Sequence, residues 1–187
     1  MPTKQPALFL DRDGVFIENC ANYVRSWADV QFFPQALAAL ARIREIPYKI
    51  IVVTNQSAVG RGIISLETAV SLNERIIEVV QEHNGRIDAS YLCPAKPGNN
   101  DPCRKPRPGM LLQAAEEHNL DLSQSFMIGD ALTDIQAGQA AGVQQALLLL
   151  TGRGSDQAQL PLANEMPPFA TFPNLATALQ HLFPNQA

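Results

Sequence analysis

Short apolar runs that alternate with amphipathic segments are the strongest constraint on the fold of this 187-residue chain. The runs are continuously apolar, as expected of strands that are buried on both faces of a parallel sheet. Between them, leucine, isoleucine, valine or alanine recurs every three or four residues, which predicts helices. Strands are expected at residues 7–10, 49–54, 89–93, 125–130 and 145–150, and helices at residues 34–46, 65–84, 108–119, 133–141 and 174–183. This alternation predicts an α/β fold with a doubly wound, mostly parallel sheet.

The length favours a single domain over residues 1–187, with a core at residues 7–154 and a C-terminal loop and helix at residues 155–187. Two proline-rich segments, residues 93–109 and 155–173, are expected to be irregular. The helices, strand and loops expected between the polar motifs leave no room for a separate cap domain. Two loops, residues 17–27 and 94–104, must therefore shape any substrate pocket.

Composition narrows the classes of function. The net charge of −4 argues against general affinity for nucleic acid, and no apolar run approaches the length of a membrane span. The first residues, MPTKQP, lack a basic and then apolar leader, so no secretion signal is expected. Three cysteines, Cys20, Cys93 and Cys103, are too few for a disulfide framework and suit a reducing cytoplasm. We expect a cytoplasmic monomer.

Polar side chains collect where the expected strands end, which is where open α/β sheets bind their ligands. Asp11 and Asp13 follow the first strand, and two carboxylates this close favour a cation between them. The remaining polar residues are Thr54, Asn55, Gln56 and Ser57 after the second strand, Arg104 and Lys105 after the third, and Asp130 and Asp134 after the fourth. Each motif alone could be a turn, a helix cap or a solvated loop. Their joint occurrence in this order favours one functional site.

The motifs FLDRDGV, VVTNQSAVGRG, CRKPRPGM, MIGDALTDIQAG and LTGRG carry a resemblance. They resemble the haloacid dehalogenase (HAD) superfamily of phosphatases, and within it the branch that contains heptose bisphosphate and histidinol phosphatases. The similarity spans residues 7–154. It implies a Rossmann-like core without a cap and a magnesium-dependent phosphatase that acts through an aspartyl-phosphate.

The resemblance also implies roles for single residues. Asp11 would be the nucleophile and Asp13 the general acid and base, while Thr54 and Lys105 would stabilise the phosphoryl group. Mg²⁺ would be held by Asp11, the main-chain carbonyl of Asp13, and Asp130. Asp134 would orient a ligand or water near the metal. Substrate contacts are expected from Arg12, Tyr23, Asn55, Gln56, Ser57 and Arg104.

The sequence departs from this branch at two places. Relatives hold a structural zinc in the loop before the lysine, but here only Cys93 and Cys103 match its ligands, with Asp101 at the third position, so zinc is not expected. Ala131 replaces a basic residue that often follows the metal-binding aspartate. The preferred substrate is a small phosphorylated metabolite, heptose 1,7-bisphosphate first. Histidinol phosphate, another sugar phosphate, and a non-catalytic phosphate-binding module remain alternatives.

Overall fold

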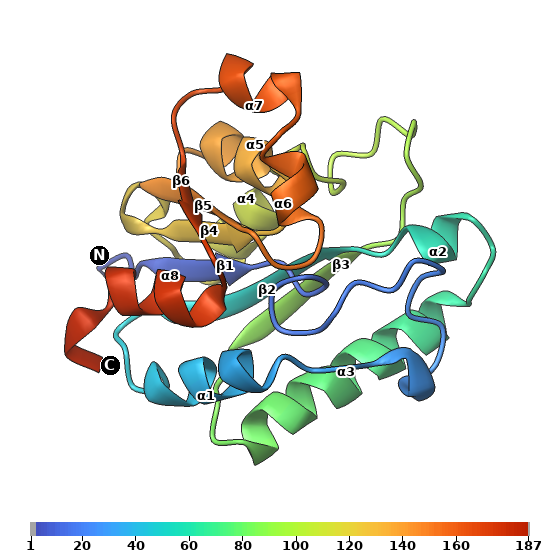
Figure 1. Ribbon diagram of the computed structural model, residues 1–187, viewed down its shortest axis with the longest axis horizontal. Helices are drawn as coiled ribbons and strands as arrows, with labels where there is room; N and C mark the ends of the chain where they lie inside the picture. The colour runs from blue at the N-terminus through green and yellow to red at the C-terminus, as the bar shows by residue number, and fades with distance from the viewer. Residues whose placement is uncertain (1–2, 187) are drawn as a thin grey trace.

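The computed structural model describes residues 3–186 and contains a six-stranded, wholly parallel sheet (Figure 1). Its strands lie in the order β3-β2-β1-β4-β5-β6, so the direction of winding reverses between β1 and β4. The strands are β1 (Ala7–Leu10), β2 (Lys49–Asn55), β3 (Ala89–Cys93), β4 (Phe126–Gly129), β5 (Gln145–Leu149) and β6 (Ala170–Phe172). The doubly wound α/β fold expected from the sequence is confirmed.

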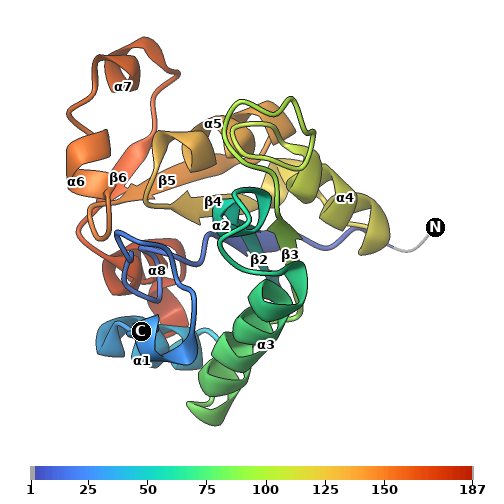
Figure 2. The ribbon, with the colours of Figure 1, turned by 90° about the vertical axis from the view of Figure 1, so that its right-hand side faces the viewer.

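Helices cover both faces of the sheet (Figures 1 and 2). One face carries α1 (Pro34–Arg42), α3 (Leu66–Glu82) and α8 (Leu175–Leu182), and the other carries α4 (Gly109–Glu117) and α5 (Leu132–Ala141). Shorter pieces are α2 (Ser57–Gly60), α6 (Gly154–Gln157), α7 (Pro161–Glu165), η1 (Trp27–Asp29), η2 (Leu122–Gln124) and η3 (Pro184–Gln186). Within residues 3–186, no helix combines the length and the apolar character needed to cross a membrane.

The central strand β1 shows why the apolar runs are continuous. Leu8 and Leu10 belong to the core under α1 and α8, whereas Ala7 and Phe9 belong to the core under α4 and α5. Successive side chains point to opposite faces of a strand, so a strand covered on both sides must be apolar throughout. Burying one such leucine or phenylalanine stabilises the fold by about 1.5–3 kcal/mol.

The helices begin and end at residues that satisfy their free backbone groups. Ser65 precedes α3 and its side chain accepts a hydrogen bond from the backbone N–H of Thr68 at 3.0 Å. Asn174 plays the same part before α8. Gly142 ends α5 with a φ of 78°, a left-handed conformation that glycine adopts without a steric cost.

The C-terminal part corrects the sequence prediction. Residues 155–173 were expected to be irregular, but they contain most of α6, all of α7, and β6 at the sheet edge. Of the three residues of β6, Thr171 is exposed and the other two are partly buried, so the strand lacks the apolar run that marks the inner strands. Helices of four or five residues are too short to show a period, which is also why α2 was missed.

Candidate active site

Two neighbouring strands and the start of one helix bring the expected carboxylates together. Asp11 follows β1 and Asp130 follows β4, and the backbone N–H of Asp11 donates to Ile128 of β4 at 2.9 Å. Asp134 lies in the first turn of α5. Carboxylate oxygens of Asp11, Asp130 and Asp134 lie within 4.8 Å of one another, and all three residues are buried.

Lys105 reaches this group from the loop before α4. Its Nζ lies 3.0 Å from Asp11 Oδ1 and 2.6 Å from Asp134 Oδ1, and it donates to the Val53 carbonyl at 2.7 Å. The backbone N–H and C=O of Lys105 bind the side-chain amide of Asn55, each at 3.1 Å. Burial opposes its charge, but the joint attraction of Asp11 and Asp134 raises the pKa of Lys105. The ammonium group is therefore a fixed positive charge beneath Asp11.

Lys105, together with the guanidinium of Arg153 that lies 3.2 Å from Asp130, does not balance three buried acids. Burial raises the pKa of Asp11 to about 7, against the pull of Lys105 and with further upward effects of Asp134, Asp130 and Asp13. Burial and Asp134 also raise the pKa of Asp130. Hard oxygen donors with surplus negative charge are the ligands that Mg²⁺ prefers, and a divalent cation among them would lower these pKa values. The donor set therefore fits a magnesium ion.

Asp130 has partners that the sequence analysis did not single out. Its Oδ2 accepts hydrogen bonds from the side chain of Asn19 and from the backbone N–H of Arg153 at 2.8 Å. The guanidinium of Arg153 lies 3.2 Å from Oδ1. A Cβ at Gly14 or at Gly152 would collide with this carboxylate, and both glycines have positive φ. Arg153 was visible in the motif LTGRG just beyond a predicted strand end, a position where ligand-binding residues gather.

Asp13 is anchored beside the buried acids. Its carboxylate accepts from Arg12 Nε at 3.0 Å and from Gln56 Nε2 at 3.1 Å, and Gln56 Nε2 also donates to Thr54 Oγ1 at 2.9 Å. Arg12 was expected to contact substrate, but its side chain is buried against Asp13. Thr54 is likewise fully buried, beneath Gln56.

A cavity of about 540 Å³ opens above these groups. Apart from Arg12, Thr54 and Asp130, every predicted site residue lines it: Asp11, Asp13, Tyr23, Asn55, Gln56, Ser57, Arg104, Lys105 and Asp134. Asn19, Cys20, Ala21, Tyr23 and Val24 come from the loop at residues 17–27, which confirms that this loop forms a wall. A separate hollow of about 430 Å³ lies between Trp27 and α3, and none of the strand-end residues lines it.

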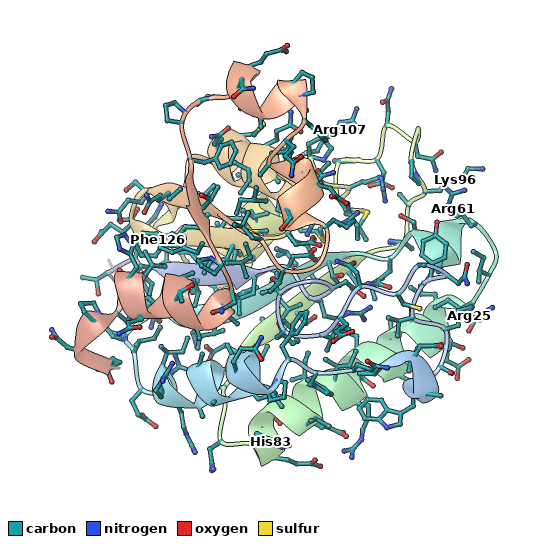
Figure 3. The ribbon with its side chains drawn as sticks, in the orientation of Figure 1. Arg25, Arg61, His83, Lys96, Arg107 and Phe126 are labelled. Atoms are coloured by element: carbon teal, nitrogen blue, oxygen red, sulfur yellow. A yellow bond between two sulfur atoms is a disulfide. The ribbon has the colours of Figure 1, made fainter. Side chains whose placement is uncertain are left out.

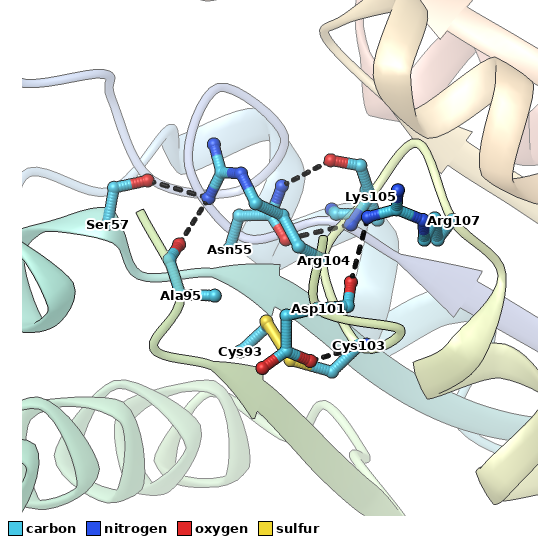
Figure 4. The surroundings of a disulfide bond; sticks show 9 residues. All are labelled: Asn55, Ser57, Cys93, Ala95, Asp101, Cys103, Arg104, Lys105 and Arg107. Carbon is cyan, nitrogen blue, oxygen red and sulfur yellow. Dashed lines mark hydrogen bonds between the residues drawn. A yellow bond between two sulfur atoms is a disulfide. The ribbon is translucent and has the colours of Figure 1, made fainter. Parts of the chain in front are cut away.

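The loop at residues 94–104 is closed by a disulfide between Cys93 and Cys103, which corrects the expectation drawn from the sparse cysteines (Figure 4). The chain folds back so that the two Cα atoms lie 5.5 Å apart, and Asp101 caps the turn by accepting from the backbone N–H of Cys103 at 2.9 Å. The spacing of two cysteines ten residues apart does not reveal such a return. Cys20 is free.

Arg104 follows the disulfide directly and lines the cavity, and Figure 4 shows its hydrogen bonds to Ser57 and Ala95. Its Nη1 donates to Ser57 Oγ at 2.8 Å and to the Ala95 carbonyl at 2.6 Å, both of them neutral acceptors. Burial and the nearby charges of Arg61 and Arg153 lower its pKa. Among residues 3–186, no carboxylate pairs with this guanidinium, and such a charge on a cavity wall suits an anionic ligand.

The fold, the four strand-end motifs and this cavity define a hydrolase of the HAD class. The HAD-hydrolase-like family model matches residues 102–178. The chain is 40% identical over 150 residues to the D-glycero-beta-D-manno-heptose-1,7-bisphosphate 7-phosphatase of Helicobacter pylori strain J99, covering 80% of this chain and 86% of that protein. The protein of the same name from Pseudomonas aeruginosa is 33% identical over 172 residues, covering 92% and 96%.

Solved structures agree with these relatives. The D,D-heptose 1,7-bisphosphate phosphatase of B. bronchiseptica, crystallised with magnesium and phosphate, superposes with a TM-score of 0.86 at 30% identity, covering 96% of this chain and 99% of that one. The Burkholderia thailandensis enzyme gives a TM-score of 0.69 at 29% identity, with the same coverage. The chain belongs to the heptose bisphosphate phosphatase family of the HAD superfamily, and it is a phosphatase.

Proposed function

We propose that this phosphatase removes the 7-phosphate from D-glycero-β-D-manno-heptose 1,7-bisphosphate. The similarity to enzymes named for this reaction supports the substrate, over most of both chains. The observation that carries the chemistry is the buried contact between Asp11 and Lys105 on the cavity wall. A carboxylate held against a fixed cation, at the end of a strand, is placed to attack a phosphoryl group.

In the first step, a carboxylate oxygen of Asp11 forms a bond to phosphorus while the bond from phosphorus to the sugar oxygen breaks. Asp13 gives its proton to the departing sugar oxygen, so the leaving group departs as an alcohol. Arg12 and Gln56 fix the Asp13 carboxylate: Oδ2 accepts from both residues, and Oδ1 accepts from Arg12 alone at 3.2 Å, so we assign the proton transfer to Oδ1. The product on the protein is an aspartyl-phosphate at Asp11.

In the second step, Asp13 takes a proton from water, and the water oxygen attacks phosphorus. The bond between phosphorus and Asp11 breaks, which releases inorganic phosphate and restores the carboxylate. Lys105 stabilises the phosphoryl oxygens in both steps, and Thr54 supports the site from its buried position through the hydrogen bond that its Oγ1 accepts from Gln56. Asn55 fixes the backbone of Lys105, because its Nδ2 donates to the Lys105 carbonyl and its Oδ1 accepts from the Lys105 N–H.

We assign a magnesium site to Asp11, the main-chain carbonyl of Asp13, and Asp130. A magnesium ion held by these groups would supply positive charge to offset that of the phosphoryl oxygens and of the two carboxylates. Asp134 holds Lys105 and accepts from the Ala131 backbone N–H at 3.0 Å, so it orients the site from behind. Treatment with a chelator should abolish turnover, and Mg²⁺ should restore it. Restoration by Zn²⁺ alone would contradict an all-oxygen site.

The sugar and its second phosphate are assigned to the loop side of the cavity. Arg104 offers an unpaired charge for an anionic group, and Tyr23, Gln56 and Ser57 offer contacts to hydroxyls. Arg12 supports Asp13 through its side chain. We retain a single cap-less domain, a monomer and a cytoplasmic location as predictions.

The deciding experiment measures phosphate release with Mg²⁺ across a panel of substrates. It includes both anomers of heptose 1,7-bisphosphate, histidinol phosphate, common sugar phosphates and a 3′-phosphorylated oligonucleotide, with Asp11→Asn as the blank. The β-anomer of the heptose bisphosphate should stand at least about 100-fold above the rest in kcat/KM, which equals about 2.7 kcal/mol of differential transition-state binding. Similar kcat/KM values for all compounds, or a higher value for another compound, would overturn the substrate assignment but not the assignment of phosphatase activity.

A further inference from the structure

Arg153 makes contacts that the proposed mechanism does not use. Its backbone N–H and its guanidinium both bind Asp130, with Nη2 3.2 Å from Oδ1 and Nε 3.4 Å from Oδ2. Asp130 is wholly buried, whereas the side chain of Arg153 is 56% exposed. One face of the guanidinium therefore meets a buried carboxylate, and the rest borders the cavity that Arg153 helps to line.

The pairing of charges gives Arg153 a distinct place among the described residues. Lys105 is shared by Asp11 and Asp134, and Arg12 is paired with Asp13. Arg153 is the cation that faces Asp130. Burial opposes its charge, but Asp130 raises its pKa, so the guanidinium stays positive across the working range of pH. A permanent positive charge thus lies against a carboxylate that we assign to the magnesium ion.

A charge in this place acts on two ligands with opposite sign. It repels a divalent cation that shares Asp130, and it attracts an anion in the cavity, where Arg104 also carries an unpaired charge. An anion bound in the cavity would offset the guanidinium charge. It would therefore reduce the repulsion between the guanidinium and the divalent cation. Such coupling between two ligands is reciprocal by thermodynamic necessity.

We propose that Arg153 couples the binding of magnesium to the binding of phosphate. Its guanidinium lowers the affinity of the site at Asp130 for Mg²⁺ until an anion enters the cavity. Arg153 is a positioning residue in this account, because it acts on the metal through Asp130. The inference rests on the magnesium site proposed above, but not on the identity of the sugar.

Calorimetric titration of Mg²⁺ into the protein tests the coupling, with and without saturating inorganic phosphate. In the wild type, phosphate should tighten Mg²⁺ binding by about tenfold. In Arg153→Gln, Mg²⁺ should bind about fivefold more tightly than in the wild type when phosphate is absent. The tightening by phosphate should fall to about threefold or less. Arg153→Lys keeps the charge and should retain most of the wild-type coupling.

Arg61→Gln is the matched control. Arg61 caps the C-terminal end of α2 (Figure 3) and lies close enough to Arg104 to lower its pKa. Within residues 3–186, Asp130 has hydrogen bonds and ion pairs with Asn19 and Arg153 but none with Arg61. The Arg61→Gln substitution removes one positive charge, as Arg153→Gln does, and should leave the affinity for Mg²⁺ within about twofold of the wild type. Equal changes in Arg61→Gln and Arg153→Gln would mean that only the overall field matters, and would overturn the proposal.

Two further results separate the possible failures. If Arg153→Gln binds Mg²⁺ more weakly than the wild type, Arg153 merely orients Asp130 and the coupling role is wrong. If the wild type binds no Mg²⁺ with or without phosphate, both this inference and the proposed metal site fail. Circular dichroism of each variant, matched to the wild type, ensures that a lost fold is not counted as a lost ligand.

Discussion

The two walls of the cavity are built differently. The inner wall consists of strand ends and of Lys105, a loop residue whose backbone is held by Asn55 at the end of β2. Asp11, Lys105 and Asp130, which is buried beside Asp11 without lining the cavity, are 5%, 2% and 0% exposed, and each is held by charged or backbone partners. The outer wall consists of two loops. There Tyr23 adopts a left-handed φ of 64° and Arg104 is held by two neutral acceptors. Bond-making groups thus lie where the sheet fixes the backbone, whereas recognition groups lie where the chain can vary.

The largest expected effect is on the inner wall. Asp11→Asn keeps the shape of the side chain but replaces the attacking carboxylate by an amide, which is not nucleophilic. We expect kcat to fall by at least about 10⁴-fold, with an unchanged circular dichroism spectrum. Asp156→Asn, an exposed acid in α6, should leave kcat unchanged. Activity of Asp11→Asn near that of the wild type would rule out the covalent mechanism.

Removal of the central cation should cost stability as well as rate. Lys105→Met fills similar volume but leaves Asp11 and Asp134 without their shared partner in a buried site. Breaking a buried pair from one side costs about 3–5 kcal/mol, which urea unfolding at neutral pH would measure. Arg107→Met changes an exposed arginine two residues along the same loop and should cost under about 1 kcal/mol. Equal losses in the two variants would show that Lys105 has no special structural role.

The outer wall should respond more mildly and mainly in substrate binding. Cys103→Ser opens the disulfide that closes residues 93–103, just before Arg104. The entropy of a loop of this length predicts a loss of about 2–3 kcal/mol and a fall in Tm of about 5–10 °C. KM should rise several-fold with little change in kcat, because Arg104 loses its anchor while Asp11 keeps its own.

Cys20→Ser is the control for that loop, since Cys20 is a free cysteine on the same cavity wall. A thiol reductant should lower the Tm of the wild type to that of Cys103→Ser. It should not change the Tm of Cys103→Ser, which already lacks the disulfide. Mass spectrometry without reductant should find Cys93 and Cys103 joined in one peptide pair. If both thiols prove free in protein that was never reduced, the outer wall is held by its turns and prolines alone.

The same division explains what the sequence could predict. Apolar runs that end in Asp11, Thr54 and Asp130 carry a strong signal, because a strand buried on both faces has few other compositions available. The parallel order of those strands then brings the acids to one edge, and the structure confirms their meeting. The inner wall therefore followed from local patterns and the general rules of α/β topology.

The outer wall could not be predicted from the sequence, because it depends on contacts between residues that are distant in the chain. Asn19 and Arg153 reach Asp130 from 111 and 23 positions away, and no local period marks either of them. The return of Cys103 to Cys93 depends on a loop path that proline content alone does not set. The short edge strand β6 was missed for a different reason: it has three residues, of which one is exposed and two are partly buried, so it lacks an apolar run.

The smallest effect concerns the cost of building the inner wall. Burial raises the pKa of Asp11 from 3.8 to about 7, so between these values the folded chain keeps a proton that the unfolded chain has lost. The unfolded state then binds fewer protons, and the stability of the wild type must fall as the pH rises through this window. Asp11→Asn does not titrate. In a chelating buffer, its Tm should exceed that of the wild type by a growing margin from pH 5 to pH 7.5, and by a constant margin above that.

Glu45→Gln, whose side chain is 83% exposed, should show no such trend. A margin that stays constant from pH 5 upward would mean that Lys105 outweighs burial and keeps Asp11 ionised throughout. The carboxylate would then be ready to attack without a metal, and the inner wall would carry no cost in stability for its chemistry.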